Sequence, residues 1–325
     1  MLRTMALAAL MAALGTLWPA SLSESLAGVG LRLVMGGGPR GSAMTHAASA
    51  LAVLLSRRIE GLEVTTEATA GSLANLQGLR RGELALAIVH AGDVRLAPAR
   101  RDGPPDHERA NAVAGLYQAP AQLVVPAGSD IRQARELLGK RVCVGGQESS
   151  TAALAERLFS ALGLWDSMTR LYLGHEDAVE AMRQGRADAI FLLDGLPSMH
   201  LAELASQEGL RILDLHAAAR ESGFHALHPG YTAATIPAGT YPGQDNAVQT
   251  LADTAWLCAA EDVPAQVVRD CLAALAAEDG LEYLASVVET AGPVAEMSQG
   301  GHALPLHPGV IRGKQALMSA GDGPR

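Results

Sequence analysis

The chain contains few aromatic residues, few cysteines and, after its first residues, no long apolar stretch. Aromatic residues make up only 3% of the 325 residues, whereas 49% are hydrophobic, so aliphatic side chains and alanine supply most of the apolar content. This composition favours closely packed α/β layers over an aromatic-rich β-sandwich. The length is sufficient for two lobes of ordinary domain size, each with its own core.

Cysteine and positive charge are both scarce. The three cysteines, Cys143, Cys258 and Cys271, cannot all pair within one chain, and their spacing is not that of a metal site. Cys258 and Cys271 both fall in segments with a helical pattern. A disulfide between them in an oxidising compartment and burial as small hydrophobes both stay open. The net charge of −9 argues against a nucleic-acid partner, which requires a basic face.

Most motifs of enzyme active sites are absent as well. The chain has no G-x-S-x-G, no H-E-x-x-H and no phosphate loop ending in Gly-Lys-Ser/Thr. His225 and His228 lie three residues apart but lead into Pro229-Gly230, so a loop without metal is the better interpretation. We therefore expect no enzyme activity, no catalytic residue, no metal and no cofactor.

One segment does match a cofactor motif. Residues Gly36 to Gly41 fit the dinucleotide pattern G-x-G-x-x-G between a strand and a helix, and Glu67 ends the next strand. An NAD-binding oxidoreductase of the Rossmann type is therefore an alternative. Pro39 and Arg40 are unusual inside such a turn, and an exported protein has little access to NAD.

The first 27 residues have the features of a secretory signal peptide. Arg3 provides the positive charge, and Met5 to Trp18 form an apolar run shorter than a membrane span. Small residues at Ser25 and Ala27 predict cleavage before Gly28, and hence a periplasmic or otherwise extracytoplasmic location. A retained N-terminal anchor is the alternative.

Strand and helix patterns alternate through the first hundred residues. Strand patterns at 31–35, 62–67 and 84–89 are separated by helix patterns at 42–58 and 71–81, which predicts a mainly parallel sheet. The alternation begins again at residue 141. The fold class that we expect is α/β, with two lobes and a ligand cleft between them.

The domain division follows from this restart. Residues 28–118 plus 226–325 are expected to form lobe 1, and residues 122–222 lobe 2. Residues 113–117 and 122–125 are expected to be two strands separated at Pro120. Residues 250–284 are expected to be mostly helical, with a break near Pro264.

Three turns share one design, in which a strand leads into a helix through small polar residues. They are Gly41-Ser42, Gly71-Ser72 and Ser149-Ser150-Thr151. A helix N-terminus offers unpaired N–H groups and a partial positive charge, which together hold an anion such as a carboxylate. Open α/β sheets bind ligands at this end of their strands. For any one turn, a simple helix cap is the competing interpretation. Asp93 and Asp194 each follow a buried strand. For each of them, contact with a ligand and capping of a helix are the alternative roles.

The chain resembles the TAXI family, the substrate-binding proteins of tripartite ATP-independent periplasmic (TRAP) transporters. Residues 69–75, Thr-Ala-Gly-Ser-Leu-Ala-Asn, are similar to that family's T-G-G-S-x-x-N. Residues 139–145 followed by Ser149 and Thr151 resemble its second ligand turn. The most specific similarities are residues 235–243 and 305–309.

This resemblance implies a two-lobed, type II-like periplasmic binding protein fold. It implies a monomer that captures a small organic anion or amino acid, of the glutamate-like or dicarboxylate class, and delivers it to an integral-membrane TRAP permease. A secreted ligand-sensing protein of the same fold is the alternative. The candidate ligand-binding residues are Gly41, Ser42, Gly71, Ser72, Asn75, His90, Ser149, Ser150 and Thr151. For Asn75, completion of a helix cap is the competing role.

Four positions depart from the family pattern. Ala43 replaces a usual aromatic residue, His90 replaces a frequent Gln, Ala119 replaces Glu, and Glu148 replaces Gly. Glu148 would add negative charge near an anion site, which favours a zwitterionic or partly cationic ligand. His90, if it faces the cleft, would make the affinity depend on pH.

Overall fold

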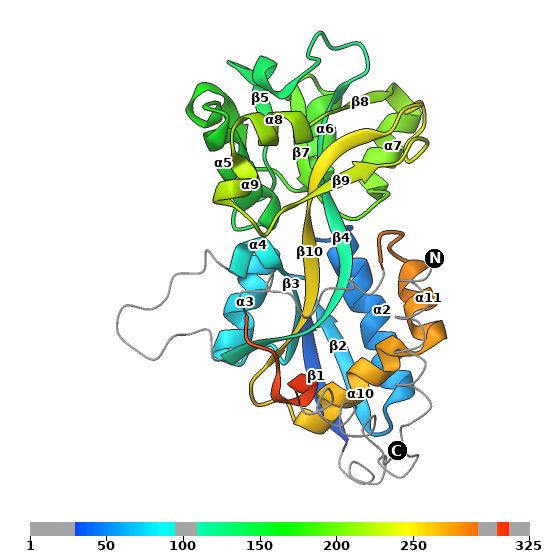
Figure 1. The fold of residues 1–325 in the computed structure, drawn as a ribbon. Helices are drawn as coiled ribbons and strands as arrows, with labels where there is room; N and C mark the ends of the chain where they lie inside the picture. Colours follow the sequence, from blue (N-terminus) through cyan, green and yellow to red (C-terminus); the bar gives the residue numbers. More distant parts are fainter. Residues whose placement is uncertain (1–29, 95–108, 292–303, 312–325) are drawn as a thin grey trace, which may run out of the picture.

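The computed structural model describes residues 30–94, 109–291 and 304–311, so the predicted signal segment 1–27 lies outside the described residues. Figure 1 shows two halves, each with its own helices, joined by two long strands that run through both. The predicted α/β, two-lobed fold class is confirmed.

The ten strands in the described residues form one curled sheet in the order β2-β1-β3-β10-β4-β7-β5-β6, with β8 also on β4 and β9 also on β10. Their bounds are β1 (Leu31–Gly36), β2 (Leu62–Glu67), β3 (Leu86–His90), β4 (Ala110–Pro126), β5 (Arg141–Cys143), β6 (Thr169–Leu171), β7 (Ala189–Leu193), β8 (Leu210–Leu213), β9 (Thr232–Ile236) and β10 (Val248–Ala260). The strands β1, β2 and β3 are mutually parallel, as are β5, β6 and β7. The predicted parallel arrangement is therefore present in each half.

The helices lie on both sides of the sheet. Their bounds are α2 (Ala43–Arg58), α3 (Ser72–Arg81), α4 (Ala91–Val94), α5 (Ser150–Ala161), α6 (His175–Arg183), α7 (Met199–Glu208), α8 (His216–Glu221), α9 (Phe224–Leu227), α10 (Ala265–Ala276) and α11 (Glu278–Ala285), with 3-10 turns η3 (Ala134–Leu137) and η4 (Trp165–Ser167). In Figure 1, α10 and α11 lie beside α2 in the lower half, although they are far from α2 in the sequence.

The long strand β4 replaces the two strands that we expected. It is continuous from Ala110 to Pro126 and pairs with β10 through residues 110–120 and with β7 and β8 through residues 121–126. Pro120 sits inside it opposite Ala252. Its missing N–H does not end the strand, because the carbonyl of Pro120 still accepts from Asp194 N at 3.4 Å.

The expectation of a mostly helical segment from residue 250 is wrong for its first part. Residues 248–260 form β10, and the helix begins only after Pro264. The strand is central and buried on both faces, so its apolar run has no alternation that separates a strand from a helix. Cys258 therefore lies in a strand, and Cys143, Cys258 and Cys271 are all buried and unpaired.

The second half also includes a segment that we had assigned to lobe 1. Ile236 and Tyr241 pack in one hydrophobic cluster with residues of α6, β7, α7 and β8. The Tyr241 hydroxyl donates a hydrogen bond to Gln122 Oε1 at 2.5 Å and accepts one from Ser198 N at 2.9 Å. Residues 232–247 thus lie with the upper half in Figure 1, and we infer that the chain returns to the lower half within β10.

A buried cluster of charged groups joins the two halves beside α4 and α5. Nη2 of Arg157 on α5 lies 3.5 Å from Oδ1 of Asp93 on α4, and these side chains are 8% and 0% exposed. Arg157 also donates to the Tyr231 hydroxyl. Asp253 on β10 accepts from Gly92 N at 3.0 Å. One buried cation therefore faces the Asp93 carboxylate, and the carboxyl group of Asp253 lies in the same cluster.

We predict that Arg157→Met lowers the free energy of unfolding by about 3–5 kcal/mol, because it leaves the buried Asp93 carboxylate without its cation. Urea denaturation measures this loss. The matched control is Arg32→Met, whose side chain is 84% exposed and should matter by less than about 1 kcal/mol. Equal effects of the two substitutions would contradict the prediction, and adding Asp93→Asn to Arg157→Met should recover part of the loss.

We also predict that Asp253 makes the fold less stable at alkaline pH. Burial raises the pKa of Asp253 to about 8, with the Asp93 carboxylate adding to the shift. Its favourable contribution is complete below the unfolded-state pKa of about 3.9 and is lost as the pH rises through about 8. Asp253→Asn should therefore reduce the fall in unfolding free energy between pH 6 and pH 9. Asp166→Asn, at a side chain 97% exposed, should leave that fall unchanged.

Candidate functional site

A cavity of about 230 Å³ lies between the two halves of the sheet. It is smaller than the roughly 300–1,000 Å³ of sites that enclose drug-sized ligands. The residues around it come from the segments that follow β1, β2, β5, β6 and β7, from the last residues of β3 and β7, and from β4. They are Pro39, Ser42, Met44, Ala70, Gly71, His90, Tyr117, Gly146, Gln147, Ser149, Ser150, Thr151, Gly174, His175, Leu193 and Asp194.

Six of the nine candidate residues line this cavity, and three do not. Those at the cavity are Ser42, Gly71, His90, Ser149, Ser150 and Thr151; the others are Gly41, Ser72 and Asn75. The structure thus brings together residues separated by more than a hundred positions in the sequence.

The start of α5 contributes three hydroxyls with different roles. Ser149 Oγ caps the helix by accepting from Ala152 N at 3.1 Å, and Thr151 Oγ1 accepts from Leu193 N at 3.2 Å. Ser150 Oγ is buried, and no hydrogen-bond partner for it lies within the described residues. A Cβ at Gly145, where φ is +87°, would lie 2.6 Å from Thr151 Cβ, so this turn requires glycine. Ser150 is the hydroxyl left for a bound molecule.

His90 approaches the cavity from the other half. It ends β3, its side chain is buried, and both ring nitrogens are without a partner among the described residues. Burial lowers the pKa of His90 to about 4, with Asp93 opposing the shift. The imidazole is therefore neutral at neutral pH and offers one N–H donor and one acceptor nitrogen.

The hydroxyl of Ser72 and the amide of Asn75 serve the fold around this site. Ser72 Oγ accepts from His90 N at 2.9 Å, which fixes the end of β3. Asn75 Nδ2 donates to the carbonyls of Gly37 at 2.5 Å and Ile88 at 2.8 Å, and Asn75 Oδ1 accepts from Thr69 Oγ1 at 2.8 Å. Asn75 therefore connects the turn after β1 to strand β3. It neither caps a helix nor lines the cavity.

The start of α2 is already occupied by a carboxylate from the other half. Ala43 N donates to Asp194 Oδ1 at 2.9 Å, and Ser42 Oγ caps the helix through Thr45 N at 3.3 Å. A Cβ on Gly41 would lie 2.5 Å from His200 Nε2, so the turn meets the upper half closely. The helix N-terminus that we expected to hold a solute anion has an anionic partner within the chain.

Asp194 also lines the cavity. Burial raises the pKa of Asp194 to about 6, while its bonds from the amides of Ala43 and Gly195 oppose the shift. Its Oδ2 lies 3.8 Å from Nδ1 of His175, whose pKa burial and the neighbouring His200 lower to about 4. At neutral pH the site thus contains one carboxylate and two neutral imidazoles.

The described residues of the cavity wall include no side-chain cation. None of the sixteen lining residues is Lys or Arg. The described part of the chain also contains no group of three His, Cys, Asp or Glu side chains arranged to hold a metal ion. The described wall would therefore meet an anion with neutral donors, namely backbone N–H groups, hydroxyls, imidazole and the Gln147 amide.

The four departures from the TAXI pattern have different consequences. Glu148 is exposed with φ of +61° and does not line the cavity, and Ala119 is buried in β4 opposite Asp253. Ala43 meets the other half, since a Cβ on Gly195 would lie 2.7 Å from Ala43 Cβ. Only His90 faces the cavity. The cavity is also lined by three residues that we did not predict, namely Tyr117, His175 and Met44. Tyr117 lies within a strand and the other two lie in helices, and no sequence pattern marks such positions as part of a cleft.

The comparisons agree with the two-lobed fold. The structure matches a periplasmic transporter with a TM-score of 0.54 and 17% identity, covering 90% of this chain and 95% of that one. It matches a putative L-cystine ABC transporter from Listeria monocytogenes with a TM-score of 0.51 and 15% identity, covering 78% and 94%. These structural similarities show that the chain has the two-lobed fold of binding proteins. The model of the NMT1-like family matches residues 35–313, and the chain belongs to that family. None of the described helices has the length and apolar character that a membrane crossing requires.

We predict that Asn75→Ala lowers the free energy of unfolding by about 2–4 kcal/mol, since it leaves buried carbonyls without donors. Thermal or urea unfolding measures the loss. Asn246→Ala, at an exposed residue, should change stability by less than about 0.5 kcal/mol. A loss no larger than that of the control would remove Asn75 from its role in positioning the β1 and β3 turns.

Proposed function

We propose that the chain is an extracytoplasmic solute-binding receptor that captures a small organic anion or amino acid and delivers it to a membrane permease. The observation that carries the proposal is the cavity between the two halves, with Ser150 Oγ and the His90 ring, both buried and without partners among the described residues. A buried polar group without a partner is costly, and a ligand that satisfies it recovers that cost.

The permease partner follows from the resemblance to the TAXI family, so our finer proposal is a TRAP-type permease and export by a cleaved signal peptide. Membership of the NMT1-like family and the fold shared with a periplasmic transporter support the broader role. Hinge closure of the two halves would bury the solute, and the permease would recognise the closed form.

The dinucleotide alternative has less support. In a Rossmann site, the pyrophosphate binds the N-terminus of the helix that follows the glycine turn. Here Asp194 accepts from Ala43 N at that position, and His200 adjoins Gly41. A pyrophosphate would have to displace a carboxylate from this helix end.

The test is a thermal-shift screen of the purified protein against α-amino acids, monocarboxylates, dicarboxylates, 2-oxoacids and NAD, followed by calorimetry. Binding only to the folded form raises the melting temperature. A shift with NAD alone, or with none of these compounds, would overturn the proposal. Uptake of a labelled solute that binds, compared in cells with and without the gene, separates a transport receptor from a sensory protein.

For a carboxylate that binds, we predict that Ser150→Ala weakens the affinity about tenfold, as expected for one lost hydrogen bond to a charged group. Calorimetric titration measures the change. Ser206→Ala, the same substitution at an exposed position of α7, should leave the affinity unchanged. An unchanged affinity in the Ser150 variant would place the anion elsewhere.

A further inference from the structure

The charges around the cavity restrict the kind of solute that fits it. Among the described residues, the wall has one carboxylate, Asp194, the imidazoles of His90 and His175, and no Lys or Arg. A dicarboxylate would bring two negative charges beside Asp194 with no side-chain cation to balance them. Burial of an unpaired charge is expensive, so the wall opposes that class of solute.

The start of α5 suits a single carboxylate. The helix α5 has 12 residues, and its first N–H groups carry partial positive charge. Ser150 Oγ has no other partner within the described residues, and the neutral His90 ring supplies a further N–H. The competing helix start, that of α2, is already taken by Asp194.

The Asp194 carboxylate suits a positively charged donor. The carboxylate of Asp194 has about four acceptor positions, of which the amides of Ala43 and Gly195 use two. Nδ1 of His175 is too distant, at 3.8 Å, to hydrogen-bond it. Asp194 is largely ionised at neutral pH and can accept from an ammonium group in the cavity.

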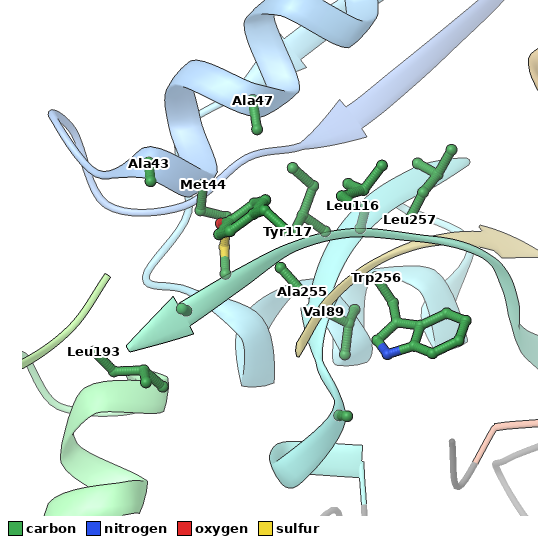
Figure 2. Packing of buried hydrophobic residues seen from close by; sticks show 14 of the residues in the cluster. Ala43, Met44, Ala47, Val89, Leu116, Tyr117, Leu193, Ala255, Trp256 and Leu257 are labelled. Atoms are coloured by element: carbon green, nitrogen blue, oxygen red, sulfur yellow. The ribbon is translucent and has the colours of Figure 1, made fainter. Parts of the chain in front are cut away.

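Part of the remaining wall is apolar. Met44, Tyr117 and Leu193 all line the cavity, and Figure 2 shows the Met44 sulfur near the Tyr117 ring, with Leu193 on the opposite half. The volume of about 230 Å³ leaves room for a small side chain only. A second charged group on the solute would find no opposite charge on this surface, whose polar groups are the Tyr117 hydroxyl and the Gln147 amide.

We propose that the solute is a zwitterion with one carboxylate, one ammonium group and a small apolar remainder, as in an apolar α-amino acid. Its carboxylate binds at the start of α5 with Ser150 and His90, and its ammonium group binds Asp194. This inference rests on the proposed function and specifies the substrate class of the same site. Asp194 is then a specificity-determining residue that also contacts the lower half through Ala43.

The experiment compares matched probes by calorimetry at pH 7.5. The apolar amino acids are L-alanine, L-valine, L-leucine and L-methionine. Their deaminated partners are, in the same order, propanoate, 3-methylbutanoate, 4-methylpentanoate and 4-(methylsulfanyl)butanoate. Succinate and 2-oxoglutarate represent dicarboxylates. We expect at least one amino acid to bind at least tenfold more tightly than its deaminated partner and than either dicarboxylate.

The substitution Asp194→Asn provides the second arm. Asparagine keeps an oxygen for Ala43 N but removes the charge, so it should reduce the preference for the amine at least tenfold. The control Asp166→Asn, at a side chain 97% exposed, should leave the preference intact. The comparison in the unsubstituted protein stands even if the Asp194 variant does not fold.

The outcomes separate the two claims. Deaminated acids or dicarboxylates that bind as tightly as the amino acids would overturn the zwitterion proposal and leave the receptor standing. A preference for the amine that survives in a folded Asp194→Asn protein would also overturn it. Binding by no probe here and by no compound of the wider screen would overturn both.

Discussion

The pairing of β4 with β10 is the constraint on which the rest of the molecule depends. The two strands pair from Ala110 opposite Ala260 to Pro120 opposite Ala252, and both then continue into the other half. There β4 pairs with β7 and β8, and β10 pairs with β9. Because these strands are shared, the two halves meet at β4 and β10 (Figure 1). The cavity lies between the halves and is lined by the last residues of β3 and β7.

Two polar contacts also hold the halves together. One is the bond from Ala43 N to Asp194 Oδ1, and the other is the ion pair of Arg157 with Asp93. Each places a charge of one half against the other half in a buried setting, where an unpaired charge is costly. Separation of the halves would expose both pairs to water, so opening loses their attraction but also removes their desolvation cost. The two contacts are thus suited to a reversible closure.

Local sequence patterns predicted the elements of this fold better than their connections. The alternation of strand and helix in residues 31–90 and 141–193 is present as expected, because each element there has a clear start and stop. The long strands were not predicted in full. Pro120 looked like a break in β4, and the first part of β10 looked helical, since a strand buried on both faces has no period of two. The extent of pairing is decided by partners that lie far away in the sequence.

The same limit applies to the site. Ser42, Ser72 and Ser150 look alike in sequence, as small polar residues where a helix begins, and the helix-cap and anion-site interpretations apply equally to each. In the structure, Ser42 caps α2, Ser72 binds His90 N, and only Ser150 is left without a partner among the described residues. Neighbours that are distant in the sequence make the difference. Asp194 lies at the start of α2, strand β3 lies against Ser72, and the start of α5 lies at the cavity. A helix start becomes a ligand site only where the fold leaves its donors unused, so the assignment requires the tertiary structure.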